Sequence, residues 1–244
     1  MWQSAGSVRA RGLIVSRLNK TLTGPLLCYV TGRLSFSEVK PTERQEILLH
    51  KIAAAAEAGV DWIQIREKDI SGRECSSLTR EAVQRTARVH ANKTSATSVL
   101  VNDRLDVALA ERAGGVHLSE KSLPLAEAKR LVGSYDDRKN FLIGISCHSL
   151  EAARSAANDG ADYLFFGPVF ATPSKAAFGV PQGLERLGEV CRAVAIPVLA
   201  IGGITLTNAA ECLSSGASGI AAIRLFQDAR DLSSLVQSLR NLKT

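Results

Sequence analysis

A short polar stretch in the first third of the chain carries two cations and an amide at alternating positions. In an extended strand successive side chains point to opposite faces, so Gln64, Arg66 and Lys68 share one side. Two cations and an amide that converge suit a phosphate or diphosphate, which arginine can bind through two parallel hydrogen bonds. The intervening Glu67 and Asp69 leave an alternative open, a surface ion-pair network with the same two cations.

The pair Asn102-Asp103 follows another short apolar run. A carboxylate next to a diphosphate site is a candidate Mg²⁺ ligand, because Mg²⁺ takes one or two carboxylates together with phosphate oxygens and water. The alternative is that Asp103 caps the amino end of a helix expected over Leu105–Ala113, a position that aspartate favours.

Four residues whose side chains could take part in catalysis or capping occur together in Ser146-Cys147-His148-Ser149. Alternation places Ser146 and His148 on one side, and His148 is a candidate acid–base group. Cys147 would then face the other way, which favours a buried structural cysteine over a nucleophile paired with His148. Ser149 is expected to cap the next helix.

Two segments near the end of the chain, one of them a glycine pair, indicate a second anion site. Gly202-Gly203 and Ile223-Arg224 each follow an apolar run, and glycine lets backbone N–H groups approach an oxyanion closely. Between them and Ser146 lies a long loop, 167–179, which carries Lys175. Long loops of this kind are often lids, so Lys175 is a candidate phosphate contact on closure; a mobile surface loop is the alternative.

The elements that must position these residues follow one repeating pattern from residue 26 onward. Short apolar runs alternate with amphipathic runs that mostly end in glycine, as at Gly59, Gly114, Gly160 and Gly216, where a left-handed residue would end a helix. Near-continuous apolar runs are typical of parallel strands buried on both faces. The eight expected strands are Leu26–Val30, Trp62–Ile65, Val99–Val101, Val116–Leu118, Leu142–Ile145, Tyr163–Phe166, Pro197–Ile201 and Ile220–Ile223.

Eight strand–helix units predict a single α/β domain over residues 26–244, a (β/α)8 TIM barrel whose site lies at the carboxyl ends of the strands. An open doubly wound sheet that binds a dinucleotide would carry G-x-G-x-x-G after its first strand, and none is present. Capping boxes beginning at Thr42 and Ser71 mark two of the expected helix starts. In a barrel, the loops after the seventh and eighth strands form a recurring phosphate site.

Composition excludes several classes of protein. No apolar stretch approaches the roughly 20 residues that span a bilayer. The net charge of +6 invites a nucleic-acid partner, but residues 1–37 hold five basic residues and no acid, which leaves 25 basic and 24 acidic residues elsewhere. The remainder therefore lacks the basic stripe that nucleic-acid binding needs. Five widely spaced cysteines predict a reduced, cytoplasmic protein. Residues 1–25 are expected to be a flexible basic extension rather than a targeting peptide.

Six motifs, in order over roughly residues 26–226, resemble the thiamine phosphate synthase family and its sister, the TenI-type thiazole tautomerases. The motifs are Gln64-Ile65-Arg66-Glu67-Lys68-Asp69, Val101-Asn102-Asp103-Arg104, Gly115-Val116-His117-Leu118, Gly144-Ile145-Ser146-Cys147-His148, the Gly167–Lys175 loop and Ala200-Ile201-Gly202-Gly203-Ile204.

The resemblance to the synthase implies an enzyme that joins hydroxymethylpyrimidine diphosphate to thiazole phosphate, giving thiamine phosphate and pyrophosphate. It implies small phosphorylated substrates, Mg²⁺ as cofactor and a homodimer. Catalysis would consist mainly of positioning and of stabilising the departing pyrophosphate. The roles carried over are pyrimidine diphosphate binding by Gln64, Arg66, Lys68 and Asn102; Mg²⁺ binding by Asp103; pyrophosphate contact by Ser146 and Lys175; and thiazole phosphate binding by Thr172, Gly203 and the Ile223–Arg224 backbone.

Two departures from the family pattern leave alternatives open. Ser122 stands where the synthase usually has a second acidic Mg²⁺ ligand, with Glu120 nearby in a different register, and Arg224 stands where a serine usually lies beside the thiazole phosphate. The arginine could strengthen phosphate binding or block the pocket. The tautomerase needs no metal and would use His148 to move a proton. A non-catalytic phosphate-binding relative is the third possibility, against which the retained Arg66, Lys68, Asp103 and Lys175 argue.

Overall fold

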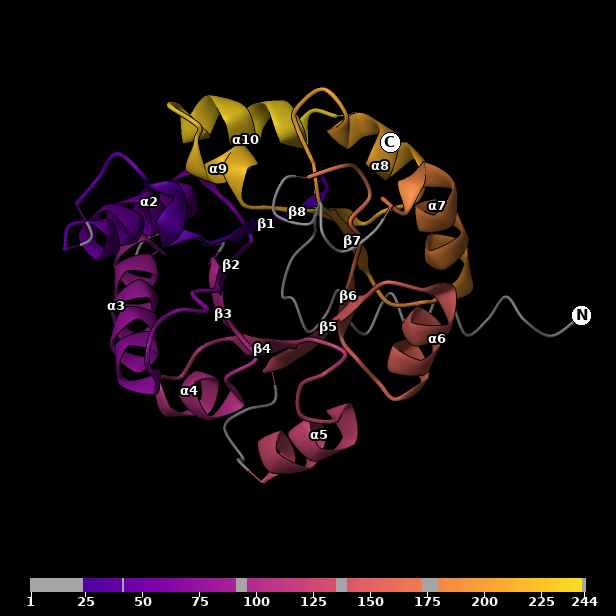
Figure 1. Cartoon of the computed structure of the whole chain (residues 1–244), viewed down its shortest axis with the longest axis horizontal. Coiled ribbons are helices and arrows are strands. Elements are labelled where there is room, and N and C mark those ends of the chain that lie inside the picture. Colours follow the sequence, from indigo (N-terminus) through magenta and orange to yellow (C-terminus); the bar gives the residue numbers. More distant parts are fainter. Residues whose placement is uncertain (1–23, 41, 91–95, 135–139, 173–179, 243–244) are drawn as a thin grey trace, which may run out of the picture.

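The computed structural model describes residues 24–40, 42–90, 96–134, 140–172 and 180–242. Eight parallel strands follow one another in chain order around a closed barrel, and β1 pairs with both β2 and β8 to complete the ring (Figure 1). The predicted (β/α)8 fold is therefore confirmed. The strands are β1 (Leu26–Val30), β2 (Trp62–Ile65), β3 (Ser98–Asn102), β4 (Gly115–Leu118), β5 (Leu142–Cys147), β6 (Tyr163–Phe166), β7 (Val198–Ile201) and β8 (Gly219–Ala222).

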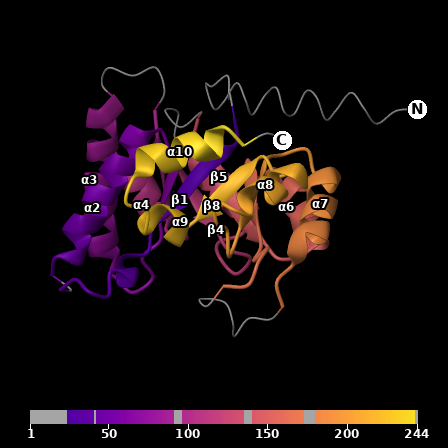
Figure 2. The same cartoon turned by 90° about the horizontal axis from the view of Figure 1, so that it is seen from above.

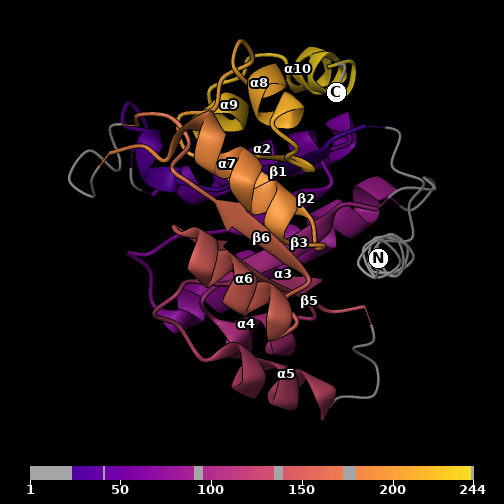
Figure 3. The ribbon, with the colours of Figure 1, turned by 90° about the vertical axis from the view of Figure 1, so that its right-hand side faces the viewer.

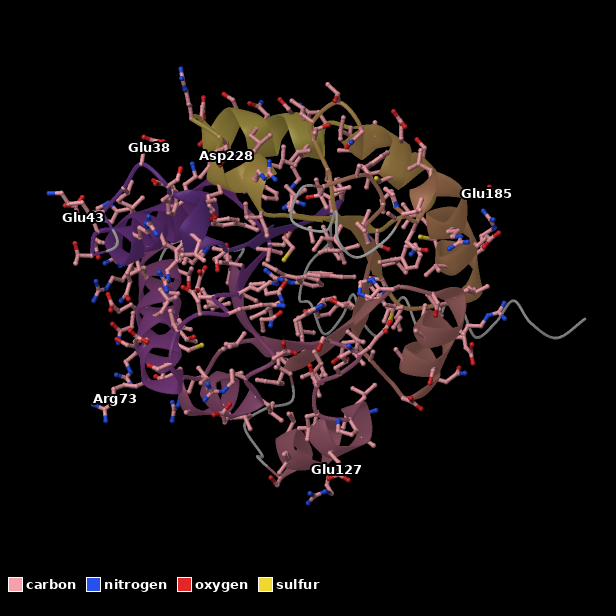
Figure 4. The ribbon with its side chains drawn as sticks, viewed as in Figure 1. Glu38, Glu43, Arg73, Glu127, Glu185 and Asp228 are labelled. Atoms are coloured by element: carbon pink, nitrogen blue, oxygen red, sulfur yellow. The ribbon has the colours of Figure 1, made fainter. Side chains whose placement is uncertain are left out.

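Helices surround the barrel, with α2 packed beside α3 on one side and α6, α7 and α8 following one another on the other (Figures 2 and 3). The charged side chains labelled in Figure 4 lie on the outer rim of this ring. The helical segments are η1 (Arg33–Ser35), α2 (Arg44–Ala58), α3 (Gly72–His90), α4 (Leu105–Ala110), α5 (Leu125–Gly133), α6 (Leu150–Asn158), α7 (Gly183–Ala193), α8 (Ala209–Ser214), α9 (Arg224–Gln227) and α10 (Leu232–Arg240).

Two of the three side-chain caps expected from the sequence are present. Ser71 and Glu74 form a reciprocal capping box at the start of α3, with N···O distances of 2.7 and 3.2 Å, and the Ser149 hydroxyl caps α6. The capping box expected at Thr42 is wrong. The Glu43 N–H instead donates to the Lys40 carbonyl in a turn, and α2 begins afterwards without a side-chain cap.

Left-handed residues end the helices as expected at Gly59, Gly160 and Gly216, with φ of 91°, 86° and 101°. The fourth junction differs. Because α4 ends at Ala110 rather than at Ala113, the left-handed position falls on Arg112, with φ of 54°, and not on Gly114.

The apolar side chains form two layers. One fills the space between strands and helices, and the other lies inside the barrel and includes Trp62, Leu100, Tyr163 and Phe165. The absence of a side chain at Gly144 makes room for the Tyr163 ring, since a Cβ there would lie 2.0 Å from Tyr163 Cζ. Glycine at this position therefore lets a large ring lie inside a small barrel.

At the amino end of the strands, Arg240 links the last helix to the residues before β1 and β2. Arg240 of α10 donates to Asp61 Oδ2 at 2.7 Å and also to the carbonyls of Pro25 and Gly59, while Asp61 accepts the Leu27 N–H at 2.9 Å. This end of a barrel serves stability. Of the extension expected over 1–25, residues 1–23 lie outside the described part of the chain, in which no helix is long and apolar enough to cross a bilayer.

Candidate active site at the carboxyl ends of the strands

Arg33 is the ion-pair partner of both Glu67 and Asp69. The sequence analysis did not identify Arg33 as a residue of the site. Its guanidinium lies 2.6 Å from Asp69 Oδ2 and 3.9 Å from Glu67 Oε2, and its backbone N–H also donates to Glu67. Within the described residues neither Arg66 nor Lys68 is in an ion pair. The alternative of an ion-pair network between these two cations and Glu67 and Asp69 is therefore wrong, because both acids pair with Arg33.

The Arg66 backbone is held in place by a relay from β1. Its N–H donates to Thr31 Oγ1 at 2.9 Å, and that hydroxyl donates to Glu67 Oε1 at 2.6 Å. The Glu67 side chain is 2% exposed, and burial raises the pKa of this carboxyl. Burial likewise lowers the pKa of Arg66, although arginine stays charged. Arg66 is thus a half-buried cation on a braced backbone.

A continuous row of hydrogen bonds crosses from β2 to the loop after β4. Gln64 Nε2 donates to Asn102 Oδ1 at 2.9 Å, and Asn102 Nδ2 donates to Asp103 Oδ2 at 2.8 Å. The other Asp103 oxygen accepts the Ser119 N–H at 3.1 Å and the Ser122 hydroxyl. The structure thus brings these predicted site residues together and places Ser122 directly beside Asp103.

Asp103 does not cap α4, so that alternative is wrong. Arg104 occupies the cap position without a side-chain hydrogen bond, and the Asp103 carboxylate turns toward the loop after β4 instead. Asp103 is exposed and takes a left-handed backbone conformation, with φ of 60°. Among non-glycine residues aspartate and asparagine adopt this conformation most readily, and an unusual backbone here projects a carboxylate into the site.

Ser146 lies at the carboxyl end of β5 and contacts a histidine inside the barrel. His117 Nε2 is 2.9 Å from Ser146 Oγ, and His117 Nδ1 is 3.1 Å from the Tyr163 hydroxyl. Burial is the main reason why the pKa of His117 falls to about 3, so the ring is neutral at physiological pH. His117 therefore lies in the barrel interior as a buried, uncharged side chain.

His148 lies just beyond β5 and is exposed. Its Nδ1 donates to the Gly167 carbonyl, and its backbone N–H donates to Glu120 Oε1 at 3.0 Å. Glu120, the acid near the missing metal ligand, therefore ties the β4 loop to the β5 loop. Cys147 is fully buried and burial raises its pKa to about 12, which confirms a structural cysteine and excludes a thiolate nucleophile.

The glycines after β7 receive the loop that follows β6. Gly202 and Gly203 have φ of 97° and 68°, and a Cβ on Gly202 would lie 2.5 Å from Pro168 Cβ. The Phe170 N–H donates to the Gly202 carbonyl at 3.0 Å. These glycines thus permit close packing of the β6 loop in addition to any anion contact.

The remaining predicted residues differ in how far the structure places them. Thr172 lies within the β6 loop and is half-buried, Ile223 is half-buried at the start of α9, and Arg224 is exposed. Lys175 lies outside the described residues. Across the described ranges no group of three or more His, Cys, Asp or Glu side chains could hold a metal ion.

The family model described as thiamine monophosphate synthase matches residues 38–226. A putative thiamine-phosphate synthase of Geobacter sulfurreducens is 41% identical over 196 residues, covering 79% of this chain and 87% of that protein. The thiamine-phosphate synthase of Methanocella arvoryzae is 44% identical over 191 residues, covering 78% and 85%.

Solved structures agree. Thiamine phosphate pyrophosphorylase from Pyrococcus furiosus has a TM-score of 0.72 and 35% identity, over 91% of this chain and 97% of that one. A 3-hexulose-6-phosphate synthase has a TM-score of 0.64 at 16% identity over 90% of this chain and all of that one, a similarity that concerns the fold alone.

Proposed function

Because the chain belongs to the thiamine monophosphate synthase family, we propose that the carboxyl face of its barrel joins hydroxymethylpyrimidine diphosphate to thiazole phosphate and releases pyrophosphate. The observation that carries the proposal is the row from Gln64 through Asn102 to Asp103, next to an Arg66 that has no ion-pair partner in the described chain. This row joins an amide suited to a pyrimidine, a cation suited to a diphosphate and a carboxylate suited to a metal.

Gln64 supports the pyrimidine half of the site. Its Oε1 is buried and has no partner in the described structure, although its Nε2 is bonded. A buried amide oxygen without a donor is costly, so the side chain is poised to accept a hydrogen bond from a ligand. The amino group of the thiamine pyrimidine is such a donor.

The diphosphate half rests on Arg66, Lys68 and Ser146, with Lys175 as a further contact. Positive charge and hydroxyl donors stabilise negative charge as it develops on a departing pyrophosphate, and they do so most strongly where the donors are held in place beforehand. The relay of Thr31 and Glu67 holds the Arg66 backbone in this way. Loss of pyrophosphate from the pyrimidine diphosphate leaves a pyrimidine carbocation, and the thiazole nitrogen bonds to that carbon. The protein therefore mainly orients the two substrates.

The donors present fit one Mg²⁺ ion. Asp103 would supply a carboxylate and Ser122 a neutral hydroxyl, while diphosphate oxygens and water complete the set that Mg²⁺ prefers. When bound, the ion would neutralise charge on the diphosphate. With a serine in place of the second acid, we expect weaker Mg²⁺ binding than at a site with two carboxylates.

On the thiazole side we assign the phosphate to Thr172, Gly203 and the backbone at Ile223–Arg224. We retain His148 as a candidate acid–base group. Its Nδ1–H donates to the Gly167 carbonyl, so Nε2 is the ring nitrogen that would exchange a proton with a ligand. We also propose a homodimer, from the family resemblance, and a cytoplasmic location, from the cysteines. Light scattering checks the first and cell fractionation the second. The fully buried Cys28 and Cys212 are free thiols and suit a reducing compartment.

The deciding experiment mixes purified protein with both substrates and Mg²⁺ and follows thiamine phosphate by mass spectrometry, with EDTA as the metal control. We expect product only with metal. For any later substitution of His148, His50→Asn is the matched control, because His50 is an exposed histidine of α2 that lies outside the site. Absence of product from folded protein that binds thiazole phosphate would overturn the proposed role. Aromatisation of thiazole carboxylate phosphate without metal would instead assign the tautomerase reaction, with His148 as the residue to change.

A further inference from the structure

Three polar side chains form a row inside the barrel that ends at the proposed diphosphate site. The Tyr163 hydroxyl lies 3.1 Å from His117 Nδ1, and His117 Nε2 lies 2.9 Å from Ser146 Oγ. Tyr163 and His117 are 1% and 2% exposed, whereas Ser146 is half-buried at the end of β5. The row therefore runs from the closed interior to the open face.

The donors and acceptors in this row can be arranged in only one satisfied way. A buried phenol needs an acceptor for its proton, and in the described chain His117 Nδ1 is the one hydrogen-bond partner of the Tyr163 hydroxyl. Nδ1 must therefore carry a lone pair rather than a proton. The proton of a neutral imidazole is then on Nε2, which donates to Ser146 Oγ.

This direction decides what Ser146 offers to a ligand. With its oxygen accepting from His117, the serine O–H points elsewhere, and within the described residues Ser146 Oγ has no second partner. The opposite tautomer would direct the serine proton to His117 and present oxygen lone pairs to the site. A diphosphate has only acceptor oxygens, so the first arrangement binds it and the second repels it.

We propose that His117 and Tyr163 are positioning residues that hold Ser146 as a hydrogen-bond donor to the pyrophosphate. This inference rests on the proposed function, since it assumes that the anion next to Ser146 is a diphosphate. Gly144 belongs to the same device, because its missing side chain lets the Tyr163 ring reach His117. The His117 carbonyl also accepts the Asp103 N–H at 2.9 Å, so this one residue is bonded to both Ser146 and Asp103.

The first test measures the tautomer directly. Two-dimensional ¹H–¹⁵N spectra of histidine-labelled protein distinguish a protonated ring nitrogen from an unprotonated one, and His50→Asn, His90→Asn and His148→Asn assign the His117 signals by elimination. We expect His117 to be protonated at Nε2 alone. Protonation at Nδ1 alone, or at both nitrogens, overturns the inference whether or not the protein makes thiamine phosphate.

The second test measures affinity for inorganic pyrophosphate by calorimetry with Mg²⁺ present. Ser146→Ala should weaken binding by roughly tenfold, in line with a hydrogen bond to a charged group. His117→Asn, whose amide is too short to reach Ser146, should weaken it about fivefold, while His117→Gln keeps an N–H donor near the Nε2 position and should restore most of the affinity. Circular dichroism checks that each variant is folded.

Equal losses in His117→Asn and His117→Gln would show a merely structural role and overturn the inference. So would unchanged affinity in folded His117→Asn when Ser146→Ala has lost it. If Ser146→Ala itself binds pyrophosphate as tightly as wild type, Ser146 does not contact the diphosphate and the functional part of the inference fails. Synthase turnover enters neither readout, so failure of the proposed function remains distinguishable.

Discussion

His117 predicts a measurable dependence of stability on pH. Its pKa is about 3 in the folded protein against an ordinary value of 6.5, and burial is the main cause. The unfolded chain therefore binds a proton at this residue below pH 6.5 whereas the folded chain does not. The stability contributed by neutral His117 is fully present above pH 6.5 and is lost as the pH falls from 6.5 toward 3.

The size of the effect follows from these two values. Between pH 7.5 and 5.5 the free energy of unfolding should fall by about 1.4 kcal/mol on account of His117 alone, at 1.36 kcal/mol for each unit of pKa difference that comes into play. The result changes little if the folded pKa is a unit higher, because the unfolded chain sets the slope in this range. The midpoint of urea unfolding should shift by roughly 0.5 M.

The assay is urea unfolding at the two pH values in EDTA, followed by circular dichroism and by tryptophan fluorescence, to which Trp62 in the barrel interior contributes. Other groups titrate over the same range, so the informative quantity is the difference between wild type and His117→Gln. We expect the variant to lack the 1.4 kcal/mol of pH dependence. His50→Gln, at an exposed site where the side chain is 72% accessible, is the control and should follow wild type. Identical pH dependence in wild type and His117→Gln would refute the claim that His117 is buried and neutral.

Three further predictions concern the metal site and the closure of the barrel. Asp103→Asn, which suits the left-handed backbone, should abolish Mg²⁺-dependent turnover while calorimetry shows thiazole phosphate binding nearly unchanged; unchanged turnover would remove Asp103 from the mechanism. Ser122→Asp should lower the Mg²⁺ concentration needed for half-maximal rate and tighten Mg²⁺ binding measured without substrates, and no change in either would contradict the placement of the ion beside Asp103. Arg240→Met should lower stability in urea by about 3–5 kcal/mol, because it removes the cation from a carboxylate, Asp61, that is 3% exposed. As the control, Arg130→Met removes an exposed ion pair with Glu127 and should lower stability by less than about 1 kcal/mol. Equal losses of stability in Arg240→Met and Arg130→Met would contradict a special contribution from the Arg240–Asp61 pair.

The local sequence pattern was sufficient to predict the barrel fold and to place the site at the carboxyl ends of the strands. Burial on both faces leaves parallel strands nearly continuous in apolar residues, and closure makes all eight carboxyl ends meet at one face. The first residues after each run were therefore candidate site residues before any contact was known. Cys147 illustrates the same point, because alternation along β5 already placed it away from Ser146, and the structure buries it completely.

Contacts between distant segments were decided only by the tertiary structure. The sequence contained Arg33, Glu67 and Asp69, but only the packing of the β1 loop against the β2 loop selects Arg33 as their partner. Asp103 was as suited to capping a helix as to facing a loop, and closure of the barrel brings the Ser119 N–H to its carboxylate.

The direction of the hydrogen bonds around Ser146 was likewise absent from any local pattern. It depends on a tyrosine 17 residues further along the chain and a histidine 29 residues before it, joined across the barrel interior. Short-range patterning determines which face a side chain occupies, because strand geometry repeats every two residues. Which donor meets which acceptor is determined by the closing of the sheet, since that step sets the distances between strands that are remote in sequence.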